Sequence, residues 1–307
     1  MYHAMRDYRF NLVTSLEVHN TLGEGVVWHQ KDAAAWWSDI QACTMYRYSP
    51  AANELQSWSM PERVGCFGFI DDGKSATPRR LIVAFASGIA YYDLQTCQTE
   101  WLARPEADIA GNRFNDGRVD RQGRFWAGTM VEDKSLSCQL GSLYAIDAGG
   151  TCLQKTSGIT ISNGLCWSPD SSVLYHADSP LNQIYAYDFD AVSGAIGNRR
   201  VFATTASGCH PDGATVDRDG YLYSAQWGGG CIVRYASTGE VDAVLRVPVS
   251  QPTCVAFGGE QLDLMFITSA KEGLSAQALA LQPHAGNLLI YQTDFCGLPD
   301  PEFTFCR

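Results

Sequence analysis

Short runs of apolar and aromatic residues recur along the chain at a long and nearly constant spacing. Each run is typical of a strand, and each is followed by a turn and a partner strand. The six runs are AAAWWSDI, RLIVAFASG, GRFWAGTM, SVLYHADS, GYLYSAQW and LDLMFITS. Aligned on Trp37, Val83, Trp126, Tyr175, Tyr223 and Phe266, they lie 43 to 49 residues apart. We interpret each run as the first strand of a repeated unit.

A repeat of this length favours a β-propeller. A four-stranded blade needs roughly 40–50 residues, and six such units cover nearly all of the 307 residues. The alternative, a β-sandwich, has strands at closer spacing and no long-period repeat. The sequence therefore predicts an all-β, six-bladed β-propeller that forms a single domain over residues 1–307, without a linker.

Turn sequences and long connections divide the repeats. SPDSS (168–172), DRQG (120–123) and DRDG (217–220) are turn signals that precede strands. Two connections, residues 131–141 and 269–286, are longer than the others. Because loops of that length often lie over a site, we expect them to carry substrate specificity.

Composition and charge narrow the class of protein. The net charge of −11 opposes binding to nucleic acid or to anionic lipid. No apolar run approaches the length of a membrane span, and the first residues lack the pattern of a signal peptide. The 11 cysteines form no C-x-x-C pair, which favours reduced thiols buried as small apolar side chains. We therefore expect a cytoplasmic protein; its oligomeric state stays open.

Four segments place polar residues beside glycine at comparable points of different repeats. Side chains that enter a propeller channel from different blades converge on one axis, so such residues can assemble a site. Each dipeptide alone is more typical of a turn than of a site, but the recurrence at matching positions favours a shared site. The four segments are Glu24 between two glycines, Arg113, Asn115 and Asp116 before Gly117, Asn163 before Gly164, and Asp212 before Gly213.

At these points the chain resembles the regucalcin and gluconolactonase family. The resemblance rests on LGEG (22–25), RFNDGRVD (113–120) with WAGTM (126–130), SNGLCWSPD (162–170), YHADS (175–179), PDGATVD (211–217), and VAFGG (255–259) leading to FITSA (266–270). It implies a six-bladed propeller with one divalent cation bound by Glu24, Asn163 and Asp212. It also implies that Arg113, Asn115 and one carboxylate, Asp133 or Glu132, contact hydroxyl groups of the substrate.

These residue types suit metal-assisted hydrolysis. Two carboxylates and an amide oxygen form an all-oxygen ligand set that accepts calcium, magnesium, manganese, zinc or iron. Three protein ligands leave positions open for water and substrate. Asp212 is then the candidate catalytic residue, because it can take a proton from the attacking water. The absence of a G-x-S-x-G motif argues against a serine hydrolase.

Three functions remain in competition. The first is hydrolysis of a sugar lactone, an aldonolactone, to the sugar acid. The second is a calcium-binding regulatory protein, which would not need Arg113 and Asn115. The third is an aryl-ester or phosphotriester hydrolase, for which a more apolar mouth is expected. Asp178 could be an additional ligand or a backbone contact, and His210 could be an acid–base group or a packed neighbour of the site.

Overall fold

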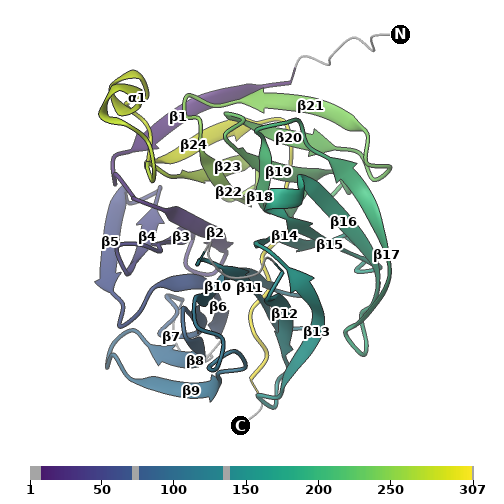
Figure 1. The fold of residues 1–307 in the computed structure, drawn as a ribbon. Helices are drawn as coiled ribbons and strands as arrows, with labels where there is room; N and C mark the ends of the chain where they lie inside the picture. The colour runs from purple at the N-terminus through teal and green to yellow at the C-terminus, as the bar shows by residue number, and fades with distance from the viewer. Residues whose placement is uncertain (1–7, 71–75, 134–138, 306–307) are drawn as a thin grey trace.

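A computed structural model describes residues 8–70, 76–133 and 139–305 and has six four-stranded antiparallel sheets around a common axis (Figure 1). The predicted six-bladed β-propeller is confirmed. The innermost strands are β2 (Gly23–His29), β6 (Val64–Ile70), β10 (Asn112–Val119), β14 (Ser162–Trp167), β18 (His210–Val216) and β22 (Pro252–Gly258). The second strands are β3 (Ala34–Asp39), β7 (Arg80–Phe85), β11 (Phe125–Val131), β15 (Val173–Asp178), β19 (Leu222–Trp227) and β23 (Leu264–Ser269).

The outer half of each blade completes the sheet. The third strands are β4 (Thr44–Ser49), β8 (Gly88–Asp93), β12 (Gly141–Ile146), β16 (Gln183–Asp190), β20 (Cys231–Tyr235) and β24 (Leu288–Thr293). The outermost strands are β5 (Glu54–Ser59), β9 (Thr99–Ala103), β13 (Cys152–Ile159), β17 (Ala195–Thr204), β21 (Val241–Arg246) and β1 (Phe10–Leu16). The N-terminal β1 pairs with β24, so one blade joins both ends of the chain and closes the ring. The outer edge of β24 is therefore paired, and the last blade has the same four strands as the others.

The six apolar runs that define the repeat are the second strands of the blades, β3, β7, β11, β15, β19 and β23. The interpretation of them as first strands is therefore wrong by one strand. Their pairing with the following strand is confirmed, for example between β3 and β4. These second strands are buried on both faces, which is why their apolar residues give the clearest signal in the sequence.

Large aromatic side chains hold neighbouring blades together. Trp36 of β3 packs edge-on against Phe69 of β6, with ring centroids 5.8 Å apart. Trp126 of β11 and Trp167 of β14 make the same kind of contact at 5.9 Å. Such pairs contribute roughly 0.5–1.5 kcal/mol each beyond their buried area. Packing between blades thus fixes the positions of the innermost strands, on which the site is built.

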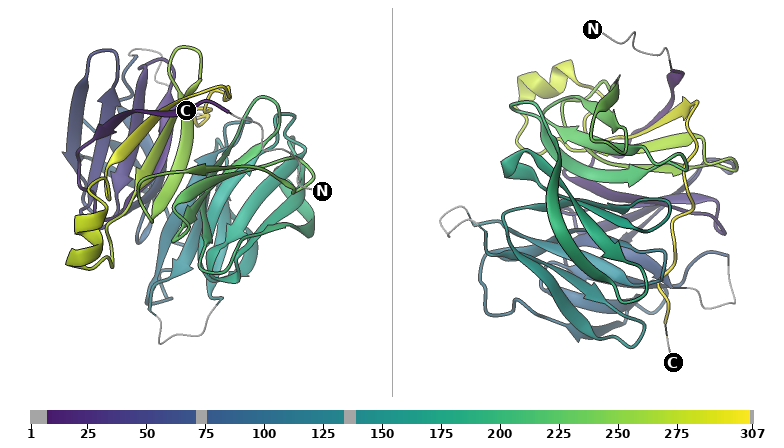
Figure 2. Two further views of the ribbon diagram at one scale, coloured as in Figure 1. Left: turned by 90° about the horizontal axis from the view of Figure 1, so that it is seen from above. Right: turned by 90° about the vertical axis from the view of Figure 1, so that its right-hand side faces the viewer.

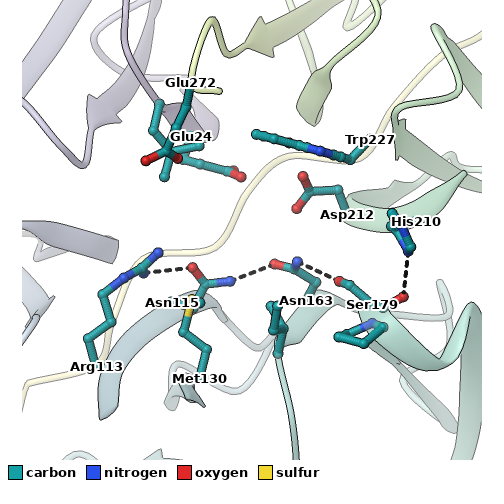
Figure 3. A pocket seen from close by; sticks show the side chains of 13 residues that line it. Glu24, Arg113, Asn115, Met130, Asn163, Ser179, His210, Asp212, Trp227 and Glu272 are labelled. Carbon is teal, nitrogen blue, oxygen red and sulfur yellow. Dashed lines mark hydrogen bonds between the residues drawn. The ribbon is translucent and has the colours of Figure 1, made fainter. Parts of the chain in front are cut away.

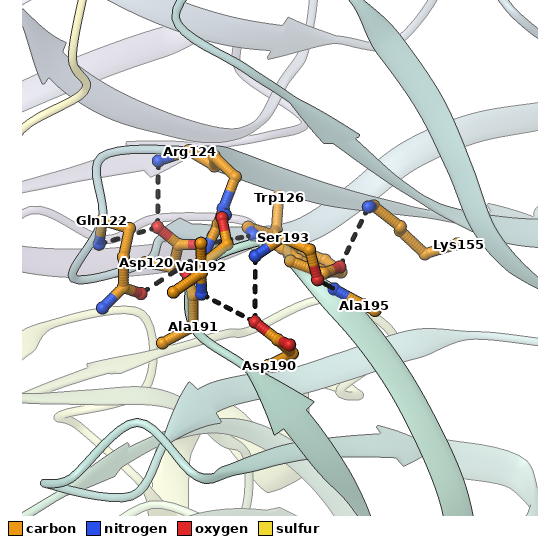
Figure 4. A network of polar contacts seen from close by, with 11 residues as sticks. Asp120, Gln122, Arg124, Trp126, Lys155, Asp190, Ala191, Val192, Ser193 and Ala195 are labelled. Carbon is orange, nitrogen blue, oxygen red and sulfur yellow. Dashed lines mark hydrogen bonds and ion pairs between the residues drawn. The ribbon is translucent and has the colours of Figure 1, made fainter.

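Buried aspartates fix the turns that connect innermost and second strands. Asp120 accepts hydrogen bonds from the backbone N–H groups of Gln122 and Arg124, and from Nε of Arg124 and Nε1 of Trp126 (Figure 4). Asp217 binds two backbone N–H groups and the hydroxyl of Tyr223 in the equivalent turn of another blade. The predicted DRQG and DRDG turns are therefore confirmed, and their aspartates also hold the second strand.

The C-terminal segment crosses one end of the channel. After β24, Gly297 forms a bridge with Asp217 on one side of the ring, and Phe303 forms a bridge with Ile70 on the other. Between them Asp300 accepts hydrogen bonds from Arg118 at 2.8 Å and from the backbone N–H of Trp28 at 3.1 Å. Figure 2 shows this segment lying against one face of the ring. It contacts the C-terminal ends of the innermost strands.

Few helices and no disulfide bond occur in the described residues. The helices are the 3-10 turn η1 (Ser179–Leu181) and α1 (Ala276–Leu281), and neither has the length or apolar character required to cross a bilayer. The nine described cysteines are free, and four of them are buried. All four buried thiols, Cys66, Cys166, Cys231 and Cys254, belong to apolar clusters, as expected for cysteines used as core residues.

Candidate functional site

The innermost strands are irregular at one level of the channel. Their pairing with the second strands shifts register between Glu24 and Val27 in β2, and shifts similarly in β10, β14 and β18. A bulge of this kind breaks the strict alternation of side chains and re-aims them. Gly25 and Gly164 take φ values of 62° and 63°, which only glycine adopts readily. The glycine dipeptides therefore lie inside strands, and the alternative that they are simple turns is wrong.

These irregular strands direct polar side chains into one cavity of about 470 Å³ (Figure 3). Five of the predicted site residues line it and are buried. The residues that line the cavity are Leu22, Glu24, Arg113, Asn115, Met130, Ile161, Asn163, Ser179, Pro180, His210, Asp212, Trp227 and Glu272. The structure thus brings together Glu24, Asn163 and Asp212 from three blades, as well as Arg113 and Asn115 from a fourth.

A continuous chain of hydrogen bonds orients the amides of the site. Arg113 Nη1 donates to Asn115 Oδ1 at 2.7 Å, and Asn115 Nδ2 donates to Asn163 Oδ1 at 2.9 Å. Asn163 Nδ2 in turn donates to the hydroxyl of Ser179 at 2.8 Å, and that hydroxyl donates to the carbonyl of Pro211. The Asn163 oxygen has two lone pairs, of which Asn115 uses one. The second lone pair is free to face a ligand.

Glu24 and Asp212 are buried carboxylates that perturb each other. Burial, followed by the charge of Asp116, raises the pKa of Glu24 to about 8. Burial, followed by the charge of Glu24, raises the pKa of Asp212 well above its usual value. Each carboxylate accepts a hydrogen bond from the backbone N–H of the following glycine, at 3.0 and 3.1 Å. Burial also raises the pKa of the nearby Asp116. Three acidic groups therefore gather where ionisation is costly without a cation.

The donor set fits a divalent cation. Within residues 8–70, 76–133 and 139–305, no three His, Cys, Asp or Glu side chains are grouped to hold a metal by themselves. The candidate set instead combines two carboxylates with the Asn163 amide oxygen, and it is hard and oxygen-only. A cation beside Glu24 and Asp212 would let both groups ionise. Raised pKa values such as those of Glu24 and Asp212 are expected for the carboxylates of a metal site to which no cation is bound.

The carboxylate that the sequence predicts shortly after GTM (128–130) contacts Arg113 and does not line the cavity. Glu132 accepts a hydrogen bond from Arg113 Nε at 3.1 Å and binds Arg63 through both oxygens, at 2.7 and 3.0 Å. Neither Glu132 nor Asp133 is among the residues that line the cavity. Asp133 is exposed, and its backbone N–H donates to the carbonyl of Gly111. Glu132 is thus bonded to a cavity residue and can hold the Arg113 guanidinium in place.

The family of the chain follows from its sequence match. Residues 22–271 match the family model described as SMP-30/Gluconolactonase/LRE-like region. The chain belongs to this family. The resemblance inferred from short motifs is thereby confirmed over most of the chain, and the site described above lies almost entirely within the matched residues.

Two relatives of the family agree with this chain in length, and one solved structure has the same fold. The L-arabinolactonase of Azospirillum brasilense is 36% identical over 290 residues, which cover 94% of this chain and 93% of the relative. The 6-deoxy-6-sulfogluconolactonase of Pseudomonas putida is 36% identical over 92% of this chain and 95% of the relative. A calcium-binding protein, regucalcin from Agrobacterium tumefaciens, has a similar crystal structure, with a TM-score of 0.88, 28% identity, and coverage of 97% of this chain and 99% of the other.

The two remaining candidates, Asp178 and His210, differ in their position relative to the cavity. Asp178 ends β15, a second strand, and accepts the backbone N–H groups of Thr160 and Ile161 at 3.0 Å each. It does not line the cavity, so the backbone-contact alternative describes it. His210 does line the cavity, and its Nδ1 lies 3.2 Å from the carbonyl of Ser179. A donating Nδ1–H would leave Nε2 as an acceptor.

Sequence reasoning missed three polar or aromatic residues of the cavity. Ser179 orients Asn163, although it follows Asp178 directly in the HADS motif. Trp227 and Glu272 contribute the remaining wall and come from the end of β19 and from the connection after β23. Glu272 lies within residues 269–286, one of the two connections expected to carry specificity. The other, 131–141, includes residues 134–138, which lie outside the described residues. Ser179 is the last residue of the matched YHADS (175–179), and the long connection 269–286 was the signal for Glu272.

Proposed function

We propose that this protein hydrolyses a sugar lactone to the corresponding sugar acid, using one divalent cation held by Glu24, Asn163 and Asp212. The observation that supports the proposal is the convergence of two buried carboxylates and one oriented amide beside Arg113 and Asn115 in a single cavity. Relatives with 36% identity over nearly the full chain are named lactonases. The identity of the metal is left to experiment among calcium, magnesium, manganese, zinc and iron.

Different side chains of the cavity have different roles in the proposed hydrolysis. Water adds through its oxygen to the lactone carbonyl carbon, and the bond from that carbon to the ring oxygen then breaks. Asp212 accepts a proton from the water and returns it to the departing ring oxygen. Arg113 and Asn115 orient the hydroxyl groups of the ring, so that the bound lactone is aligned for attack by water. When bound, the cation polarises the carbonyl and lowers the pKa of water.

The polar side chains that line the cavity favour this function over the other candidates. A site that only bound calcium would not require Arg113 and Asn115, whose hydrogen bonds reach across blades to Asn163. An aryl-ester or phosphotriester hydrolase would be expected to have a more apolar mouth, whereas seven of the cavity residues named above are polar or charged in addition to His210. The following assay separates these possibilities.

We expect acid release from aldonolactones that depends on a divalent cation. A pH-stat assay with a panel of aldonolactones should show hydrolysis above the spontaneous rate, loss of that hydrolysis in EDTA, and recovery on adding back one of the candidate metals. An aryl ester and a phosphotriester complete the panel. Tight calcium binding without acid release would favour the regulatory alternative. Hydrolysis of lactones that is insensitive to thorough chelation would contradict the metal assignment.

Metal-free protein is expected to lose stability as the pH rises from about 5 to about 8. The pKa of Glu24 is raised by burial, then by Asp116, from 4.5 to about 8 in the folded protein. Between these values the folded state keeps a proton that the unfolded chain has released. This contribution is therefore complete below about pH 4.5 and is lost as the pH passes through about 8.

A bound cation should reverse this trend, because it replaces the protons on the carboxylates. Thermal unfolding curves measured with EDTA and with excess divalent cation, across this pH range, provide the test. The stabilisation by the cation should grow with pH. Stabilisation that is constant or that shrinks with rising pH would contradict the assignment of Glu24 and Asp212 as ligands.

A further inference from the structure

Part of the cavity lining is not used by the proposed chemistry. It comprises the apolar residues Leu22, Met130, Ile161 and Pro180, the half-buried Trp227, and Glu272. Figure 3 shows Trp227 and Glu272 on one side of the cavity and Asn115 and Asn163 on the other. A ring bound between these two sides would present hydroxyl groups to the amides and other substituents to Trp227 and Glu272.

Glu272 is held in place at both its backbone and its side chain. Its backbone N–H donates to the carbonyl of Thr21 at 3.0 Å, and its Oε1 accepts a hydrogen bond from Gln41 Nε2 at 2.8 Å. Within the described residues Glu272 forms no ion pair, and the nearby Arg63 is bound to both oxygens of Glu132. The carboxylate therefore presents a fixed negative charge and a free acceptor oxygen to the cavity.

The described lining of the cavity contains three carboxylates, one arginine and no lysine. A divalent cation would balance Glu24 and Asp212. Arg113 already donates from Nε to Glu132 and from Nη1 to Asn115. An acidic substituent on the substrate would therefore lose its water near Glu272 without gaining a cationic partner. Leaving a buried charge unpaired in this way is a strong means of rejecting a ligand.

We propose that Glu272 sets the substrate class, so that uncharged aldonolactones are accepted and lactones that carry a second acidic group are rejected. The carboxylate accepts a hydrogen bond from a hydroxyl group of the neutral sugar, and Trp227 covers the apolar C–H face of the ring. This inference rests on the proposed lactonase function. The family fold does not by itself exclude anionic substrates, because one relative is named for a sulfonated gluconolactone. The selectivity therefore belongs to the side chains of this cavity.

The test compares two lactones that differ mainly in charge, D-glucono-1,4-lactone and D-glucaro-1,4-lactone. The glucarolactone carries a carboxylate in place of the terminal hydroxymethyl group of the gluconolactone. The parent protein should favour the uncharged lactone in kcat/KM by at least about tenfold, the effect expected for a like charge a few ångströms away at a partly solvated site. Glu272→Gln keeps an acceptor oxygen but removes the charge. It should reduce the preference about fivefold by raising kcat/KM for the glucarolactone, and Glu272→Lys should reduce it further.

Glu260→Gln provides a control with the same change in net charge, because Glu260 is exposed and does not line the cavity. Its preference ratio should equal that of the parent. A parent that hydrolyses both lactones equally, or a ratio that is the same in the parent, Glu272→Gln and Glu272→Lys, would overturn the inference while leaving the lactonase function intact. A parent that hydrolyses neither these nor other aldonolactones would overturn the proposed function, and the inference with it.

Discussion

Replacing Asp212 by asparagine is expected to lower kcat/KM for the preferred lactone by at least about a thousandfold. The substitution removes one proposed ligand charge and the proposed proton acceptor, and general-base assistance alone is worth roughly 10²–10⁴ in rate. Asparagine is close to aspartate in size, so the cavity should keep its shape. Steady-state kinetics, together with calorimetric titration of the variant with the divalent cation, would measure the two losses separately.

Stability distinguishes this loss of function from misfolding. Burial and the charge of Glu24 raise the pKa of Asp212, so its ionised form is costly in the metal-free protein. Metal-free Asp212→Asn should therefore be at least as stable as the parent at pH 8. This is the behaviour of a group retained for function at the expense of stability. A folded variant that keeps more than about a tenth of the parental kcat/KM would remove Asp212 from the mechanism.

Asp178→Asn supplies the matched control. Asp178 is also buried and lies beside Ser179, but its carboxylate accepts two backbone N–H groups and does not line the cavity. Its amide variant keeps only one acceptor oxygen for these two donors. We therefore expect a loss of stability of about 1–3 kcal/mol, with kcat/KM for the lactone changed far less than in Asp212→Asn.

The period of the repeat was sufficient to predict the fold, but the order of strands within a blade was not. Second strands such as AAWWSD of β3 are continuous apolar runs, since both of their faces are buried. The innermost strands contain NDG, SNG and PDG, which are turn-like in sequence. They form strands nevertheless, because packing between blades and the bulges override the local preference. The strands that carry the site are thus those that look least like strands.

The site was predictable where several residues form a motif and was missed where single residues act. Glu24, Asn163 and Asp212 lie beside glycines that permit the bulges, so their pattern recurs in the sequence. Glu272 enters the cavity from a long connection whose path depends on its bond to Gln41 in another blade. No local signal encodes a contact between residues more than two hundred positions apart.

We expect a second large effect, on the free energy of unfolding, at the end of the channel away from the cavity. Arg118 lies fully inside the ring, with 9% of its side chain exposed, and Asp300 of the C-terminal segment is its ionic partner, with 14% exposed. The Asp300 carboxylate also accepts the backbone N–H of Trp28. Asp300→Ala would leave a buried guanidinium without its counter-charge and a backbone donor without its acceptor.

Asp300→Ala is therefore expected to lower the free energy of unfolding by about 3–5 kcal/mol, the cost of breaking a buried ion pair by removing one partner. Urea denaturation of the metal-loaded protein would measure it. Asp294→Ala is the control from the same segment, because Asp294 pairs with Arg9 where both side chains are about half exposed (49% and 50%), and such pairs contribute roughly 0–1 kcal/mol.

The double variant Arg118→Met/Asp300→Leu separates the loss of a counter-charge from the loss of packing. It removes both charges while keeping apolar volume at the two positions, and it should recover much of the stability that Asp300→Ala loses. If Asp300→Ala instead costs no more than Asp294→Ala, the C-terminal segment does not hold Arg118 in the channel, and the crossing segment contributes little to the closure of the ring.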